Sequence, residues 1–520
     1  TMPIFFQDIP KKLCMVSNIP MKKLFWCIVV TLFFTTTNLI QAQNTNVLTQ
    51  IFTPQQLKED FRRMREQLEQ NQPGLYAYTP KPKMDRYLDS LYASLTKPMT
   101  LIQFLHRVKP VLMKIRNGHN NIYASKKASA YARSKGKFFP LGVAWVQGKL
   151  YVQDVYDAKA KVPRGSEIKQ INGTPVKTIL HKLLTQYSSP DGYNETFSRR
   201  RIARSFAFAY YWYISQSEQF SITYKAPKSL EDKTITIQGI AFKPLRAQLL
   251  KARAPKKVNK TSKKMLGFEL LNDQTALLRI TSFSRDRIKK GGQRYKKFLR
   301  KTFKTMQQKQ IKNLIVDVRG NGGGDDGYGN LLFSYLTNRP FNYYRYVETK
   351  VNQIEHPEYY EDKREIRAAN KQFESLVNKI ANNKYHLKEN EGLGRFKPKS
   401  NAFTGNLYIL INGGCFSATG EFVACAHYNK RGVFIGEEAG GNYYKNTSGA
   451  MLGLILPHTK LKVIVTIMQY VMDVSGYPKG RGVMPDYPVE YTIDDLQQGN
   501  DKDMQKALKL IQDQVSTNRK

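Results

Sequence analysis

The stretch from Leu407 to Lys430 reads LYILINGGCFSATGEFVACAHYNK. It begins with an apolar, β-favouring run, breaks at Gly413-Gly414, and has a helical composition from about Ser417. A strand, a glycine turn and a helix that starts at a serine place a hydroxyl beside the free N–H groups and the positive dipole end of the helix. Two interpretations follow. Ser417 is either a helix N-cap, the commonest role for serine at such a position, or a nucleophile.

A second glycine turn favours the nucleophile. Asn313 to Val318 (NLIVDV) predicts another buried strand, and the run Arg319-Gly320-Asn321-Gly322-Gly323-Gly324 follows it. Consecutive glycines let the backbone approach a ligand closely and aim N–H groups at an anion. Acyl transfer requires both parts, a nucleophile and donors for the oxyanion that its attack creates.

Four motifs resemble one family, the C-terminal-processing (tail-specific) serine peptidases. Val316–Gly323 is similar to their D-x-R-x-N-x-G motif, and Phe416–Phe422 to their nucleophile motif S-A-x-E-E-F. Gly436–Gly441 matches the G-E-x-x-G-G turn, and Gly482–Asp486 the closing G-V-x-P-D. The resemblance covers roughly Gln50 to Ile511. It implies a mixed α/β fold with a crotonase-like core of β-sheet and crossover helices, preceded by an N-terminal helical domain and a PDZ-like β module.

The N-terminal residues predict export. Residues 21–42 have a Lys-Lys start, an apolar run from Leu24 to Phe34 and a small Ala42 before the expected cleavage point, as in a secretory signal peptide. The apolar run is well short of the ~20 residues that span a bilayer, so we expect no membrane span after cleavage. Residues 1–20 precede a natural-looking start at Met21 and are interpreted as a wrongly assigned upstream segment. The expected location is a bacterial periplasm or the extracellular space.

Length and composition limit the remaining possibilities. A mature chain of about 480 residues is too long for one core, and we expect three parts: a helical domain at 43–125, a PDZ-like module at 126–250 and a peptidase core at 265–520 with an insertion at 338–404. The formal net charge is +42 and the pI about 9.9, but the basic residues are spread along the chain without a nucleic-acid motif. We interpret them as solvated surface with a modest attraction to acidic envelope components, and expect no nucleic-acid partner. Of the four cysteines, Cys415 and Cys425 follow the cleavage point, too far apart along a helix to form a disulfide, and we expect both to be small buried side chains.

Local patterns predict the elements before the core. Thr53-Pro54 and Thr100 are expected helix N-caps, each followed by apolar residues at helical spacing. Gly165–Gly173 resembles the hairpin of peptidase-associated PDZ domains, and Pro140–Val143 is a candidate carboxylate-binding loop beside an exposed sheet edge. Residues 193–217 are helical and rich in aromatic residues, and we interpret them as packing. Residues 251–264 are dense in lysine and predict a linker. The insertion is either a lid or an ordinary surface segment.

The general base is the main open question. The best-known family members use a lysine about 25 residues after the serine, but Asn442 occupies that place here, and an amide cannot accept the proton. His119, in Asn117-Gly118-His119-Asn120, resembles the D-G-H-T element of the branch that lacks this lysine, which includes the tricorn-core type, although Asn117 and Asn120 depart from it. Lys445 is the alternative base, but its polar neighbours 446–448 argue against the burial that would lower its pKa.

The resemblance therefore implies an exported serine peptidase acting on polypeptides. Ser417 is the expected nucleophile and His119 the base, and Gly322, Gly323 and Ala418 the oxyanion donors. Asp317 and Arg319 are expected to clamp the glycine turn. A carboxylate should orient the imidazole, and Glu437, Glu438 and Asp486 are the candidates. No metal site or cofactor is expected, because the histidines lack ligand spacing. The alternative is a catalytically inactive binder of peptides or hydrophobic ligands on the same scaffold, as in the retinoid-binding proteins of vertebrate retina.

Overall fold

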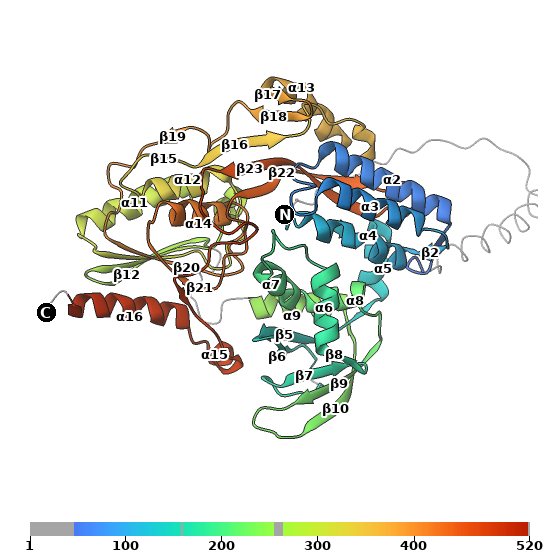
Figure 1. Cartoon of the computed structure of the whole chain (residues 1–520). Helices are drawn as coiled ribbons and strands as arrows, with labels where there is room; N and C mark the ends of the chain where they lie inside the picture. The colour runs from blue at the N-terminus through green and yellow to red at the C-terminus, as the bar shows by residue number, and fades with distance from the viewer. Residues whose placement is uncertain (1–45, 158–159, 254–263, 518–520) are drawn as a thin grey trace, which may run out of the picture. The chain divides into compact units, whose positions relative to one another are not determined.

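The computed structural model describes residues 46–157, 160–253 and 264–517 (Figure 1). The chain divides into two units, Thr1–Gln50 and Ile51–Lys520, and the architecture below belongs to the second. The expected upstream segment and signal peptide lie outside the described residues, as does most of the lysine-rich linker. Among the described residues, no helix combines the length and the apolar composition needed to cross a bilayer.

A six-stranded sheet in the order β12-β13-β14-β20-β21-β24 forms the core. The strands from β13 to β24 run parallel, whereas β12 pairs antiparallel with β13. Parallel neighbours need crossover connections, and helices follow β13, β14 and β20. The predicted mixed α/β fold with a largely parallel sheet is confirmed. The elements are β12 (Leu266–Asn272), β13 (Thr275–Ile280), β14 (Asn313–Asp317), β20 (Asn406–Ile411), β21 (Val433–Gly436), β24 (Tyr487–Pro488), α10 (Arg285–Lys290), α11 (Tyr295–Gln308), α12 (Asp326–Ser334) and α14 (Ala418–Tyr428).

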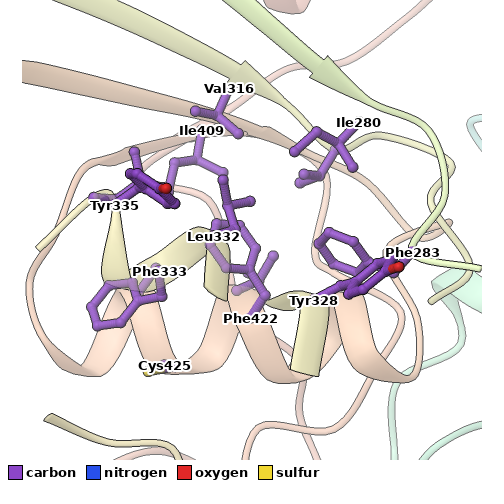
Figure 2. Packing of buried hydrophobic residues seen from close by; sticks show 14 of the residues in the cluster. Ile280, Phe283, Val316, Tyr328, Leu332, Phe333, Tyr335, Ile409, Phe422 and Cys425 are labelled. Carbon is purple, nitrogen blue, oxygen red and sulfur yellow. The ribbon is translucent and has the colours of Figure 1, made fainter. Parts of the chain in front are cut away.

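Helices cover both faces of this sheet. On one face, α10, α11, α12 and α14 share a hydrophobic cluster with the strands. Figure 2 shows part of this cluster: Ile280, Val316 and Ile409 from strands, and Leu332, Phe333 and Phe422 from helices. On the other face, Ala507 and Ile511 of α16 (Lys502–Thr517) pack with Ile315 and Leu410. Because alternate residues of one strand face opposite layers, a strand covered on both sides must be apolar throughout, which explains the uninterrupted runs in β14 and β20.

The N-terminal helices begin where the sequence predicts. They are α2 (Pro54–Asn71), α3 (Lys81–Ala93) and α4 (Leu101–Ile115). Thr53 and Thr100 each form a capping box, with Gln56 and Gln103 respectively, so both predicted caps are confirmed. Arg116, directly after α4, has a left-handed backbone (φ 55°), which ends the helix and turns the chain into the segment that carries His119.

An antiparallel sheet in the order β10-β9-β7-β6-β5 follows in the chain. Its two tightest turns, Gln147-Gly148 and Asn172-Gly173, have left-handed backbones at both positions, the geometry of two-residue hairpins. Pro140–Val143 is not a loop: Leu141 and Gly142 pair with β6, and the run is buried, so the proposed carboxylate-binding loop is wrong. The aromatic segment is helical and buried at Phe206, as predicted. The elements are β5 (Leu141–Val146), β6 (Lys149–Val155), β7 (Glu167–Ile171), β9 (Gln219–Lys225), β10 (Asp232–Gln238), α6 (Val176–Gln186), α7 (Thr196–Arg204) and α8 (Phe206–Tyr213).

The insertion at 338–404 is built into a further sheet, ordered β17-β18-β16-β23-β22. Strand β16 of the insertion pairs antiparallel with β23, which belongs to the core sequence after Ser417. The insertion is therefore neither a separate lid nor a simple surface segment, because its backbone completes a sheet. The elements are β16 (Tyr344–Thr349), α13 (Lys363–Leu376), β17 (Val377–Ala381), β18 (Lys384–Leu387), β22 (Lys445–Ile455) and β23 (Lys462–Met472).

Short elements complete the described chain. Two-residue strands pair in β1 with β2, β4 with β11, β15 with β19, β3 with β23 and β8 with β7. The division into a helical domain, a PDZ-like module and a core stays a prediction. These elements are β1 (Ile51–Phe52), β2 (Met99–Thr100), β3 (Ile122–Tyr123), β4 (Lys137–Phe138), β8 (Thr174–Pro175), β11 (Ile240–Ala241), β15 (Phe341–Asn342), β19 (Arg395–Phe396), α5 (Lys126–Lys135), α9 (Phe242–Arg253), η1 (Pro357–Tyr359) and α15 (Ile493–Gln498).

Candidate active site

The two glycine turns meet at one edge of the core sheet. Strands β14 and β20 are parallel neighbours, so their carboxyl ends lie side by side. A Cβ added to Gly323 would lie 2.8 Å from the Ser417 Cβ and 2.9 Å from the Ala418 nitrogen. Only glycine fits this contact, and the left-handed backbone of Gly323 (φ 91°) requires it independently. The predicted meeting of the triple-glycine bend with Ser417 is thus observed.

Ser417 precedes helix α14 with a strained backbone and a side chain that does not cap the helix. Its φ of 56° and ψ of −135° lie in a region that side-chain-bearing residues rarely adopt. Its side chain makes no capping hydrogen bond to α14, so the N-cap interpretation is wrong. The residue is partly exposed. A serine on a sharp strand-to-helix turn presents its hydroxyl away from the sheet, which is the arrangement of a nucleophile elbow.

His119 reaches the serine from the segment that follows α4. Its Nε2 lies 3.2 Å from the Ser417 Oγ, within hydrogen-bonding distance. Burial, with a smaller contribution from the charge of Arg201, lowers the pKa of His119 to about 4. The imidazole is therefore neutral at neutral pH and can accept a proton. Its ring also packs against Phe416, with the centroids 4.6 Å apart.

None of the three candidate carboxylates, Glu437, Glu438 and Asp486, has a hydrogen bond to the His119 imidazole among the described contacts. Glu437 accepts from Arg200 and from the Gly413 N–H, while Glu438 accepts from Arg481 and from the Gly482 N–H. Asp486 accepts from the Phe434 N–H. These acids stabilise the turns around the site, because glycine-rich turns expose N–H groups that need acceptors. Within the described chain, the buried Nδ1 of His119 has no hydrogen-bond partner.

A buried carboxylate that the sequence did not indicate holds the segment before His119. Asp191 accepts from the backbone N–H of Asn442 at 3.0 Å and of Gly118. Burial raises the pKa of Asp191 to about 6, while these two hydrogen bonds oppose the rise. One side chain thus joins the turn that carries the imidazole to the loop that contains Asn442. No motif marks Asp191, because it lies far from both turns in the sequence.

Asn446 and Glu421 form a second network at Ser417 that the sequence also did not indicate. The Asn446 Nδ2 donates to the Glu421 Oε1 at 2.6 Å and lies 3.4 Å from the Ser417 Oγ. The hydroxyl of Tyr344, from the insertion, donates to the Glu421 Oε2 at 2.5 Å. Burial, reinforced by the nearby charge of Asp326, raises the pKa of Glu421 to about 8. The only available signal was Glu421 itself, one turn after Ser417 on α14 and therefore on the same helix side.

Asn442 and Lys445 have environments that differ from the sequence-based expectation. The Asn442 Nδ2 donates to the Tyr78 hydroxyl at 2.6 Å. Residues 446–448 are buried, so the argument that polar neighbours keep Lys445 exposed was wrong. Burial lowers the pKa of Lys445. Among the described contacts, however, Lys445 makes no hydrogen bond to Ser417, whereas His119 does.

Among the described residues, two of the three expected oxyanion donors have a backbone N–H with no hydrogen-bond acceptor. The Gly323 N–H donates to the Asn321 Oδ1 at 3.0 Å, so it already has an acceptor. Within the described chain, the amides of Gly322 and Ala418 have no acceptor. The position of a Cβ on Gly322 faces open space, with no atom within 4 Å. Among the described residues, Gly322 and Ala418 are therefore the expected donors whose amides remain available.

Cys415 is a buried neighbour of the serine and not a second nucleophile. Both described cysteines are free and buried, as predicted. The Cys415 Sγ lies 3.2 Å from the Val318 carbonyl, and burial raises the pKa of its thiol to about 12. A protonated thiol is a poor nucleophile, because attack requires the thiolate.

The expected clamp of Asp317 and Arg319 is present and larger than the sequence indicated. Arg319 binds Asp317 and also Asp501 and Asp503, which stand at the start of α16. The side chains of Arg319, Asp317 and Asp503 are 15%, 7% and 6% exposed. The guanidinium therefore ties the glycine turn to the helix that covers the opposite face of the sheet.

Removal of this clamp should destabilise the fold. We expect Arg319→Met to lower the free energy of unfolding by about 3–5 kcal/mol, because it removes the guanidinium that pairs with the buried carboxylates of Asp317 and Asp503. The matched control is Arg279→Met, since Arg279 pairs with the same Asp317 but is 47% exposed. That control should cost at most about 1 kcal/mol. Urea unfolding followed by circular dichroism measures both, and equal losses would contradict a role for Arg319 beyond surface pairing.

Comparison with known proteins agrees with this geometry. A strained serine beside a glycine-rich bend on a parallel sheet supports a peptidase, a hydrolase of peptide bonds. Residues 274–489 match peptidase family S41, which confirms the family resemblance carried by the four motifs. No curated protein matches the chain.

Solved structures share the fold over most of the chain. The structure of mature CPAF complexed with lactacystin is 16% identical, covers 89% of this chain and 99% of its own, and superposes with a TM-score of 0.59. A mutant of CPAF is 13% identical, covers 86% and 94%, and gives 0.60. At such identities the likeness concerns the fold alone.

Proposed function

We propose that this chain is an exported serine peptidase that cleaves polypeptides with Ser417 as nucleophile and His119 as general base. The observation that carries the proposal is the 3.2 Å separation of the His119 Nε2 and the Ser417 Oγ, on a strained turn beside the glycine bend. The match of residues 274–489 to peptidase family S41 supports a polypeptide substrate. Export rests on the predicted signal peptide.

The first step is attack on the peptide carbonyl. With its ring proton on Nδ1, His119 accepts the Ser417 hydroxyl proton at Nε2. Asn446 assists, because an Nδ2–H that donates to the Oγ leaves the hydroxyl proton free for the imidazole. The tetrahedral oxyanion then receives hydrogen bonds from the Gly322 and Ala418 amides and the positive end of the α14 dipole.

The second step expels the amine. The imidazolium returns its proton to the leaving nitrogen, and an acyl group remains on the Oγ. Water then repeats the sequence, with His119 again accepting a proton and giving it back to Ser417. The low pKa of His119 favours transfer of the proton to the leaving nitrogen, because an imidazolium with a low pKa gives up its proton readily.

A fluorophosphonate probe tests the nucleophile. We expect the probe to label the folded wild-type chain and the Cys415→Ser variant, and to leave Ser417→Ala unlabelled. The cysteine variant is the matched control, since Cys415 lies on the same turn and is buried. Absence of label on folded wild type would reject the peptidase in favour of the ligand-binding alternative.

A further inference from the structure

Helix α11 carries positive charges that form no ion pairs with other described residues. Its inner side is buried, at Tyr295, Leu299, Phe303 and Met306 among others. Its outer side carries five exposed cations, here called the basic face: Lys296, Lys297, Arg300, Lys301 and Lys304. Successive positions advance by about 100° around a helix, so these five share one side, opposite the buried residues. Figure 1 places α11 beside the core sheet.

The basic face has no internal compensation. Within the described chain, none of its five cations forms an ion pair. The adjoining α10 adds Arg287, Lys289 and Lys290, which form none either, and one acidic residue, Asp286. Helix α2 shows the contrast, because Arg62 and Arg65 each have a glutamate four residues later. The cations of the basic face therefore lack the acidic partners within the helix that α2 provides.

The arrangement also opposes the stability of its own helix. Like charges three and four residues apart repel, as at Lys297, Arg300 and Lys301. Lys296 and Lys297 lie in the first turn, where the helix dipole disfavours cations, and this turn holds no acidic residue. An anionic partner would relieve both the repulsion between the like charges and the unfavourable position of the cations at the start of the helix.

We propose that the basic face docks the protein on an anionic lipid bilayer. The face follows a helix of 14 residues, about 21 Å long, which presents all five charges to a flat surface at once. Four of the five are lysines, which act as hydrated point charges and suit diffuse attraction better than bidentate recognition. No large hydrophobic side chain is exposed among residues 285–309, so the face offers no ring to stack on nucleic-acid bases.

The expected strength follows from the charge count. Each lysine near an anionic bilayer contributes about 1 kcal/mol, and every 1.4 kcal/mol is tenfold in affinity. Removing four lysines should therefore weaken binding roughly 10²–10³-fold. The attraction should also fall with salt, because exposed charges are screened within about 10 Å at 0.1 M ionic strength.

Cosedimentation with vesicles tests the proposal. Wild type should bind vesicles of 70% phosphatidylcholine and 30% phosphatidylglycerol and should not bind phosphatidylcholine alone. The combined variant Lys296→Gln, Lys297→Gln, Lys301→Gln and Lys304→Gln should lose this binding. The matched control removes four exposed lysines elsewhere, with glutamine at Lys177, Lys228, Lys233 and Lys243, and should bind within about threefold of wild type on the same per-charge argument.

Two outcomes would overturn the docking surface. Equal weakening in both variants would assign the binding to net charge. Duplex DNA that competes as well as anionic vesicles, and through the same four lysines, would show that the face does not select lipid. The measurement does not depend on catalysis, so it can fail while the fluorophosphonate result holds, and the reverse is also possible.

Discussion

The His119→Ala variant is expected to retain its fold and lose at least about 10⁴-fold in kcat. The imidazole is the group in hydrogen-bonding reach of the Ser417 Oγ that can accept its proton. Removing one member of a serine–base pair typically leaves only the catalysis supplied by binding and the oxyanion donors. Steady-state cleavage of an unstructured polypeptide measures kcat, and circular dichroism checks the fold.

Two control variants make this result specific. His427→Ala removes a histidine from the same helix as the nucleophile, where its Nδ1 contacts the Tyr443 hydroxyl at 3.1 Å, and should change kcat only a few-fold. Lys445→Met removes the alternative base. If Lys445→Met abolished turnover and His119→Ala preserved it, the roles proposed for these two residues would be reversed.

The pH profile gives an independent measure of the same base. A general base works when unprotonated, so kcat/KM should fall on the acidic side near the His119 pKa of about 4, well below the ordinary value of 6.5. Titration of His119 itself should therefore leave kcat/KM unchanged between about pH 5 and 7, the range in which Asp191, with its pKa of about 6, titrates. Arg201→Met removes a positive charge that depresses this pKa, so it should move the acidic limb to higher pH.

The sequence predicted the framework of the site because that framework is a property of strands and turns. Two apolar runs, each ending in glycines, had to place their carboxyl ends at one edge of a parallel sheet, and β14 and β20 do so. His119 was predicted by family resemblance alone. Its approach depends on the left-handed turn at Arg116 and on Asp191, and neither has a local signal.

Side-chain partners could not be predicted for a physical reason. Glu437 and Glu438 lie within the Gly436–Gly441 turn, yet their oxygens accept hydrogen bonds from N–H groups of neighbouring loops. Lys445 was expected to be exposed because the residues after it are polar. Those residues are buried because β22 pairs with β23, where Thr447 accepts a hydrogen bond from Gln469. Burial of polar groups depends on partners distant in sequence, which a local pattern does not contain.

Gly323→Ala should be the substitution in the glycine bend that acts most directly on Ser417. Its new Cβ would stand 2.8 Å from the Phe416 carbonyl oxygen and 2.8 Å from the Ser417 Cβ. The left-handed backbone adds strain for any side chain. Because these neighbours are the backbone and root of the nucleophile itself, relief of the clash must move Ser417 or the oxyanion donors. We expect kcat to fall at least about 10²–10³-fold, the usual cost of one lost oxyanion contact.

Gly322→Ala is the matched comparison, one residue earlier in the same bend. Its Cβ meets no atom within 4 Å, and its amide N–H is retained, so turnover should stay within about tenfold of wild type. Fluorophosphonate labelling rates separate the two effects, since they report the serine and its donors without the need for a substrate. A thermal melt records any loss of folding in Gly323→Ala. If both alanines labelled equally fast, the contact between the glycine bend and Ser417 would not control the chemistry, and the oxyanion donors would have to be sought elsewhere around the serine.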